Sequence, residues 1–302
     1  MRKFIVRVLL FVLPVIVLII TGELLLRRLP NDYRNKRNYL DKYASDISIL
    51  ILGSSHALNG INPDYFSEKA FNAAYISQTI DLDAEIIKKY DMQWQKLKYI
   101  VLSLSYFTLE EQIEKSIEAW RIKNYVLYWK TRKSCKITDH SEILGNKLRY
   151  NLYRIGKYYF FGENPVICDE NGWKKKYENK STATGKERAK LHTIDDPISF
   201  KENTATVESI IQYATSKNLK IILLTFPASQ SYIENLDFFQ INKVIDFATA
   251  MTEKYANTFH YNFLTDSTFL AGDFFDADHL NEKGSAKLSI KLNEIFNAHK
   301  IE

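Results

Sequence analysis

Two polar clusters hold the hydroxyl, imidazole and carboxylate groups that nucleophilic catalysis uses. The first is Gly53-Ser54-Ser55-His56, and the second is Asp276-Ala277-Asp278-His279, near the C-terminus. A carboxylate three residues before a histidine can hold one ring nitrogen and stabilise the imidazolium that forms when the other nitrogen accepts a proton. A serine hydroxyl facing that second nitrogen becomes a nucleophile at neutral pH. The two clusters therefore predict acyl chemistry at Ser55.

Each of these residues also has a structural interpretation. Either serine, Ser54 or Ser55, is a suitable helix N-cap. His279 is suited to capping the last helix at the surface, and Asp278 is an alternative carboxylate partner for the imidazole. His56 is an alternative base, although its position beside the nucleophile favours a supporting hydrogen-bond donor.

Five short apolar runs alternate with amphipathic stretches and are the candidate strands. They span residues 47–52, 70–77, 98–107, 219–227 and 258–264. The first run is β-branched and ends at Gly53, which is typical of a strand buried on both faces of a parallel sheet. Strand-helix-strand order implies right-handed crossovers. We therefore expect a three-layer α/β fold with a mostly parallel five-stranded, flavodoxin-like sheet and helices on both faces, and ligands at the carboxyl ends of the strands.

The amphipathic stretches predict helices between these strands. The expected helices cover residues 63–69, 81–97, 202–217, 236–255 and 282–299, the first of them N-capped by Asn62. Residues 108–201 interrupt the alternation with an aromatic, basic and partly helical insertion, which we expect to cap the sheet. The part from 120 to 192 carries 17 Lys and Arg against 7 Asp and Glu. Its aromatic residues favour an insertion core over a sugar-binding platform.

The first 28 residues form a separate element. From Phe4 to Leu26 the chain is almost wholly apolar, close to the length that crosses a bilayer as a helix. We expect an uncleaved anchor at 1–28, a polar linker at 29–46 and the α/β domain at 47–302; a cleaved signal peptide and a buried soluble helix are the alternatives. A strict count of flanking positive charges favours a cytoplasmic domain. The short basic N-terminal tail favours an extracytoplasmic one, which is our prediction.

Two cysteines, Cys135 and Cys168, both lie in the insertion. In an extracytoplasmic domain they can form a disulfide, and two free thiols are the alternative. Neither belongs to a Cys-x-x-Cys or Cys/His cluster, so we expect no metal and no cofactor. We also expect no nucleic-acid partner, because the chain has no recognisable module for one.

The two polar clusters resemble blocks of the SGNH/GDSL hydrolase superfamily. Gly53-Ser54-Ser55 matches its first block, and Asp276 to His279 matches its Asp-x-x-His block. Asn72-Ala73-Ala74 stands where the second block has glycine. The resemblance implies Ser55 as nucleophile, His279 as base and Asp276 as its orienting carboxylate. It also implies an oxyanion hole made by the Ser55 and Ala74 amides.

The third block of that superfamily supplies Gly-x-Asn, and this chain has Ser103-Leu104-Ser105 in its place. Ser103 and Ser105 are either ordinary strand residues or part of the site. With its N-terminal anchor, the chain is similar in layout to the members that serve cell-envelope acylation, such as the teichoic-acid D-alanylation and alginate-acetylation proteins.

The resemblance implies a serine esterase or O-acyltransferase that acts on acyl groups, chiefly acetyl, of an envelope glycan through an acyl-Ser55 intermediate. Its partners would be that acylated polymer and a membrane-bound acyltransferase. The alternative is a non-catalytic scaffold of the same fold that binds glycan or the acyltransferase.

Overall fold

The computed structural model describes residues 1–175 and 183–298. Part of the lysine-rich stretch and the expected end of the last helix at His299 lie outside the described residues. Internal contacts divide the chain into two compact units. The anchor unit comprises Met1–Arg37 and Ala119–Val166, and the sheet unit comprises Asn38–Glu118 and Ile167–Glu302. The expected insertion is thus divided between them, and the predicted domain boundaries stay a prediction.

The sheet unit is built on five parallel strands. They are β1 (Ile49–Leu52), β2 (Ala70–Asn72), β3 (Tyr99–Ser103), β4 (Lys220–Thr225) and β5 (Thr258–Asn262), in the order β2-β1-β3-β4-β5. Every residue of β1 and β3 is buried, whereas the edge strand β5 is only partly covered. The predicted fold class, a parallel five-stranded α/β sheet, is confirmed.

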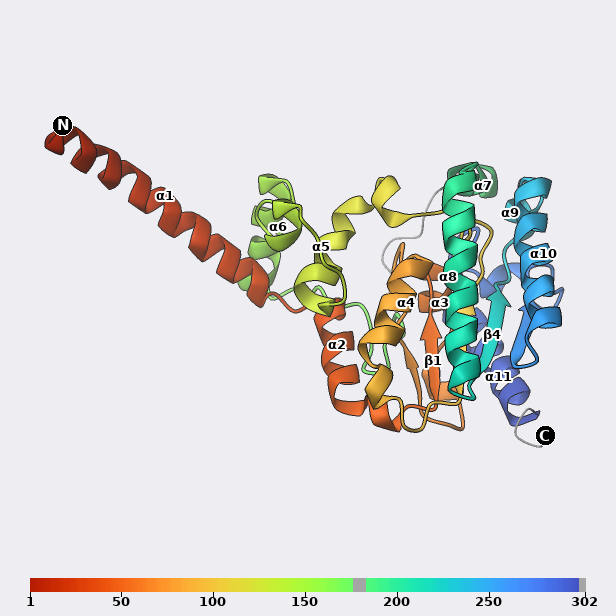
Figure 1. Ribbon diagram of the computed structural model, residues 1–302. Helices are drawn as coiled ribbons and strands as arrows, with labels where there is room; N and C mark the ends of the chain where they lie inside the picture. The colour runs from red at the N-terminus through yellow and green to blue at the C-terminus, as the bar shows by residue number, and fades with distance from the viewer. Residues whose placement is uncertain (176–182, 299–302) are drawn as a thin grey trace. The chain divides into compact units, whose positions relative to one another are not determined.

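Helices cover both faces of this sheet. In Figure 1, α4 (Ile80–Lys89) and α8 (Pro197–Ser216) lie in front of the strands, and α11 (Glu282–Ala298) lies behind them. The remaining helices of this unit are α3 (Ser55–Gly60), α7 (Gly185–His192), α9 (Gln230–Ile233) and α10 (Phe238–Lys254). All five β-strands run the same way, so their carboxyl ends share one edge of the sheet. The loops that follow β1 and β5 carry the two polar clusters.

Several predicted helix boundaries are wrong, and the sequence pattern did not show α3. The helix predicted over 63–69 is a single 3-10 turn, Pro63–Tyr65, because β2 begins at Ala70 and leaves no room for more; its N-cap is Asn62, as predicted. The helix predicted over 81–97 ends at Lys89. The helix predicted from 202 begins five residues earlier, where Asp196 caps it through the N–H groups of Ile198 and Ser199.

The anchor unit contains α1 (Arg2–Arg28), α5 (Ile122–Asn124) and α6 (Leu148–Tyr159), and α2 (Asp32–Tyr43) connects it along the chain to the sheet unit. The buried carboxylate of Glu142 binds Lys123, Tyr128 and Arg154. Burial opposes its charge, but the cations Lys123 and Arg154 outweigh burial and lower the pKa of Glu142 to about 2. This buried polar network lies in the same unit as buried apolar side chains that include Leu26, Tyr125 and Trp129.

Within the described residues, α1 is the one helix long and apolar enough to cross a membrane, a property that signal sequences share. Its apolar side chains from Phe4 to Ile20 are exposed. The cysteines Cys135 and Cys168 are free thiols in this structure.

Gly53→Ala tests the turn that ends β1. Gly53 has φ of +121°, and an added Cβ would lie 2.3 Å from Cβ of Ser103. We expect Gly53→Ala to lower the free energy of unfolding by about 3 kcal/mol, because strain and steric overlap add. Thermal melting of the detergent-solubilised full chain measures this. The control is Gly272→Ala, where nothing lies within 4 Å; equal melting temperatures for both variants would contradict the expectation.

Candidate active site

The first polar cluster forms the turn between β1 and α3. Gly53 provides the left-handed backbone that lets the chain reverse beyond the sheet edge. Ser54 is the N-cap of α3, and its Oγ accepts the backbone N–H of His56 at 3.5 Å. Ser55 is the first residue of the helix and is half-buried. Ser54 is therefore the N-cap, and the hydroxyl of Ser55 does not have this role.

The second cluster forms a tight turn between β5 and α11. The Oδ1 atom of Asp276 accepts the backbone N–H of Asp278 at 3.1 Å and that of His279 at 2.9 Å. The N–H of Phe275 donates to the carbonyl of His279 at 2.8 Å. The turn is therefore closed by Asp276 itself, which holds the histidine next to its own carboxylate.

The structure brings Ser55, His279 and Asp276 into one hydrogen-bonded series. Nε2 of His279 lies 2.8 Å from Oγ of Ser55. Nδ1 of His279 lies 2.9 and 3.0 Å from the two carboxylate oxygens of Asp276. The three side chains line a cavity of about 640 Å³. This geometry allows His279 to take the serine proton while Asp276 stabilises the resulting positive charge.

A second polar series lies beside the first. His56 Nδ1 is 2.7 Å from Oγ of Ser105, and His56 Nε2 is 3.1 Å from Oδ2 of Asp278. Ser105 Oγ in turn lies 3.1 Å from Oγ of Ser103. Both ring nitrogens of His56 are therefore engaged, which favours its supporting role over that of base. The described residues that line the cavity do not include His56, Ser103 or Ser105.

Asp278 is the second aspartate near the imidazole, but it is not the closer one. Its Oδ1 lies 3.6 Å from Nδ1 of His279, against 2.9 Å for Asp276. Both oxygens of Asp278 accept from Arg188, through Nε at 2.8 Å and Nη2 at 2.7 Å. The geometry thus favours Asp276 as the orienting carboxylate and makes Asp278 the counter-ion of Arg188.

Burial and neighbouring charges determine the ionisation of Asp278 and of the histidines around it. Burial opposes the charge of Asp278, but His279, His56 and Arg188 outweigh it and hold its pKa well below the usual range. Burial lowers the pKa of His56, and it lowers the pKa of His192 to about 3. Two neutral imidazoles and one guanidinium therefore surround a single buried carboxylate.

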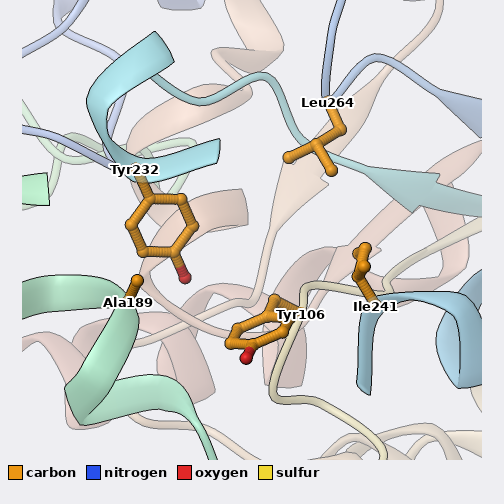
Figure 2. Packing of buried hydrophobic residues seen from close by; sticks show 5 residues of the cluster. All are labelled: Tyr106, Ala189, Tyr232, Ile241 and Leu264. Carbon is orange, nitrogen blue, oxygen red and sulfur yellow. The ribbon is translucent and has the colours of Figure 1, made fainter. Parts of the chain in front are cut away.

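Arg188 and His192 are residues that the sequence did not identify as part of the site. Both lie on α7, within a stretch whose basic composition is typical of solvated surface. Figure 2 shows why α7 lies here: Ala189 faces Tyr232 in a buried cluster that includes Tyr106. His192 Nδ1 also lies 2.8 Å from the Tyr232 hydroxyl. The one sequence signal was the capping box that begins α7, Thr184 with Glu187.

The predicted oxyanion hole needs a correction at Ala74. The Ala74 N–H donates to Oδ1 of Asn72 at 3.1 Å, because that side chain folds back to bind the carbonyls of Ala57 and Ile61. Ala74 is fully buried, whereas Ser77, three residues further on, lines the cavity. Ser77 has φ of +55°, a region that glycine favours. The second-strand loop therefore reaches the cavity at Ser77.

Beyond Ser55, Asp276 and His279, apolar and charged side chains both line the cavity, the charged ones being Glu110, Glu111, Lys115, Glu118, Lys174, Arg188 and Asp196. Its apolar lining comes from Ile76, Phe107, Ile117, Leu191, Ile194 and Phe275. Glu111 also lines it, and burial together with the charge of Glu118 raises the pKa of Glu111 to about 7. The apolar side chains can accommodate an apolar part of a ligand next to Ser55.

Three potential metal ligands, His56, Asp278 and His279, lie within 4.8 Å of one another. They fit a metal poorly, because Arg188 already occupies both oxygens of Asp278 and Ser55 occupies Nε2 of His279. No step is assigned to a metal.

No family model and no curated protein matches this chain. Solved structures with similarity include a protein from Streptococcus pneumonia assigned as a platelet activating factor, at 13% identity and a TM-score of 0.44, covering 95% of this chain and 98% of that one. A protein assigned as an acylhydrolase from Bacteroides fragilis NCTC 9343 matches at 12% identity and TM-score 0.38, covering 86% and 96%. A GDSL-like lipase from Bacteroides thetaiotaomicron VPI-5482 matches at 11% and 0.40, covering 88% and 99%.

Glu111→Gln tests the raised pKa of the cavity carboxyl. Below the unfolded value of 4.5 both states are protonated, and above about 7 the folded state bears the full cost of a buried charge. We expect Glu111→Gln to raise the free energy of unfolding by little at pH 5 and by up to about 3 kcal/mol at pH 8. Denaturant unfolding at the two pH values measures it. Glu234→Gln, at an exposed position, is the control, and a pH-independent gain at Glu111 would count against the idea.

Asp278→Asn tests the buried counter-ion. Removing the charge leaves Arg188 without its carboxylate, so we expect a loss of about 3 to 5 kcal/mol at neutral pH. Because the folded pKa of Asp278 is depressed, the wild-type advantage is complete above the unfolded value of about 4 and shrinks as the pH falls below it. Urea unfolding from pH 7 downward measures the difference. Exposed Asp246, changed to Asn, is the control; a wild-type advantage that grows on acidification would refute the assignment.

Proposed function

We propose that this chain is an SGNH/GDSL-type serine esterase or O-acyltransferase that acts on acyl groups, chiefly acetyl, of a cell-envelope glycan. The observation that carries the proposal is the contact of Nε2 of His279 with Oγ of Ser55, with Asp276 on the opposite ring nitrogen. That series opens on a cavity large enough for an acyl ester. It contains every proton-transfer group that acyl transfer to serine needs.

The first half of the reaction acylates Ser55. The serine Oγ attacks the ester carbonyl carbon while Nε2 of His279 takes the hydroxyl proton, and Asp276 stabilises the imidazolium. The carbonyl oxygen becomes an oxyanion that the N–H of Ser55, at the start of α3, can stabilise together with the backbone of Ser77. His279 then gives its proton to the departing alcohol oxygen as the ester C–O bond breaks. The product is an acyl-Ser55 ester.

The second half removes the acyl group. His279 takes a proton from the acceptor, whose oxygen attacks the acyl-Ser55 carbonyl, and returns that proton to Oγ of Ser55 as the serine ester breaks. Water as acceptor gives hydrolysis, and a sugar hydroxyl gives transfer. The helix α1 favours transfer, because an anchored enzyme remains beside the membrane where envelope polymers are assembled.

The proposed location is the outer face of the membrane, with α1 retained as anchor and a membrane-bound acyltransferase as partner. The alternative, a non-catalytic scaffold, is favoured by the missing third-block asparagine. Ser105, which stands in its place, binds His56 instead of reaching the cavity. A non-catalytic scaffold does not require the Ser55 hydroxyl to contact an imidazole at the wall of a cavity, so we favour the enzyme.

Ser55→Ala tests the nucleophile. In detergent, the full chain should react with a serine-directed fluorophosphonate and hydrolyse p-nitrophenyl acetate. We expect Ser55→Ala to abolish labelling and to reduce turnover by ~10⁴-fold, as deletions within catalytic triads do. Ser54→Ala is the matched control and should keep its labelling, since Ser54 acts as a helix cap. Labelling that persists in Ser55→Ala would reject the proposed nucleophile, and no labelling of the wild type would favour the scaffold.

A further inference from the structure

Helix α6 of the anchor unit buries a polar side chain and exposes apolar ones, whereas a helix of a water-soluble domain usually buries its apolar face. Asn151 is its one buried residue, and the Asn151 amide donates to the carbonyls of Glu142 at 3.1 Å and Ile143 at 3.3 Å. Arg154 Nη1 donates to the buried carboxylate of Glu142 at 2.7 Å. The face of α6 that packs on the protein is therefore held by polar groups.

A neighbouring face of α6 is apolar and largely exposed, with only Ile155 partly covered. Leu148, Leu152, Ile155 and Tyr159 recur at intervals of four, three and four residues, which places them on one stripe. Leu148 is 67% exposed and Leu152 is 59% exposed. We call these four residues, together with Phe160 and Phe161 that follow them, the α6 stripe; the two phenylalanines are 81% and 77% exposed. Water is a poor solvent for such a surface.

The α6 stripe is attached to the end of α1, inside the same unit. The Tyr159 hydroxyl donates to the Leu25 carbonyl at 3.1 Å. The carboxylate of Glu23 accepts the N–H groups of Glu142 and Ile143, each at 3.0 Å. These contacts fix the segment from 141 to 159 at the last turns of α1.

That junction coincides with the end of the apolar run. Exposed apolar side chains cover α1 from Phe4 to Ile20, and Glu23, Arg27 and Arg28 follow. At 1.5 Å per residue, about 20 residues span the ~30 Å hydrocarbon layer, so the charged turns of α1 lie at the membrane surface. Tyr159 and the two phenylalanines are therefore held where aromatic side chains gather in membrane proteins.

We propose that the α6 stripe lies in the interfacial layer of the bilayer that α1 spans, with its apolar side chains among the outer parts of the lipid acyl chains. Lys147 and Arg149, exposed at the beginning of α6, lie beside the stripe and suit the phosphates of lipid headgroups. A lipid surface is favoured over a second copy of the chain because the stripe continues the lipid-facing surface of α1 at the level where that surface ends. This inference is independent of the catalytic proposal.

Depth measurement by spin labelling tests the placement. In full-length protein with Cys135→Ser and Cys168→Ser, single replacements Leu152→Cys and Phe160→Cys carry a nitroxide. The matched control is Met92→Cys, at a position 88% exposed in the sheet unit. The protein is reconstituted into vesicles of phosphatidylcholine and phosphatidylglycerol. We expect the ratio of collision with oxygen to collision with a water-soluble nickel complex to be several-fold higher at both α6 positions than at Met92.

Two results would overturn the proposal. Equal ratios at all three positions would mean that α6 lies in water, and labels shielded from both reagents would mean that protein covers the stripe. Photolabelling of the unmodified chain by a lipid that carries a diazirine gives a second readout without substitutions. Adducts on peptides from 148–161 as well as on α1 are expected, and adducts on α1 alone would contradict the placement.

Discussion

The arrangement of the candidate active site depends on the buried carboxylate of Asp278. It binds Arg188 of α7 through both oxygens and His56 of α3 through one, and it lies next to His279 in its own turn. Three segments far apart in the chain thus converge on one buried charge. A lone carboxylate is costly to bury, so the packed turn that carries His279 depends on the cation that α7 supplies.

This constraint explains why two aspartates stand so close to one imidazole without sharing its role. Asp276 closes its own turn and contacts Nδ1 of His279 at hydrogen-bond distance, while Asp278 is drawn away by Arg188. The guanidinium neutralises the second carboxylate, so the imidazole has one strong partner and a fixed orientation. The series from Ser105 through His56 then supports Asp278 from behind the nucleophile instead of competing with His279 for Ser55.

The sequence sufficed to predict the parallel sheet and to indicate that Ser55, Asp276 and His279 come together, and it failed where tertiary contacts decide. Strand β1 is wholly apolar, and β3 and β4 are apolar except at their ends, a pattern that local composition indicates directly. Ala74 was expected to supply an amide because its position resembles a motif, but the Asn72 side chain takes that amide for itself. The sequence did not identify Arg188, because a basic residue on a polar helix is usually solvated. In the structure, Ala189 of the same helix packs in a cluster with Tyr232, and Arg188 reaches Asp278.

The aromatic insertion is a second case in which the sequence pattern does not show what covers a helix face. Its composition favoured an insertion core, and Tyr125, Tyr128 and Trp129 are indeed buried. In α6, however, the buried residue is Asn151 and most of the apolar side chains are exposed. Hydrophobic periodicity identifies one face of a helix but does not say whether protein or lipid covers it. The difference lies in Glu142: a buried carboxylate that gathers Lys123, Tyr128 and Arg154 draws the polar face inward. The leucines and phenylalanines of the stripe are then exposed, and beside the end of α1 the apolar solvent that we propose for them is the bilayer.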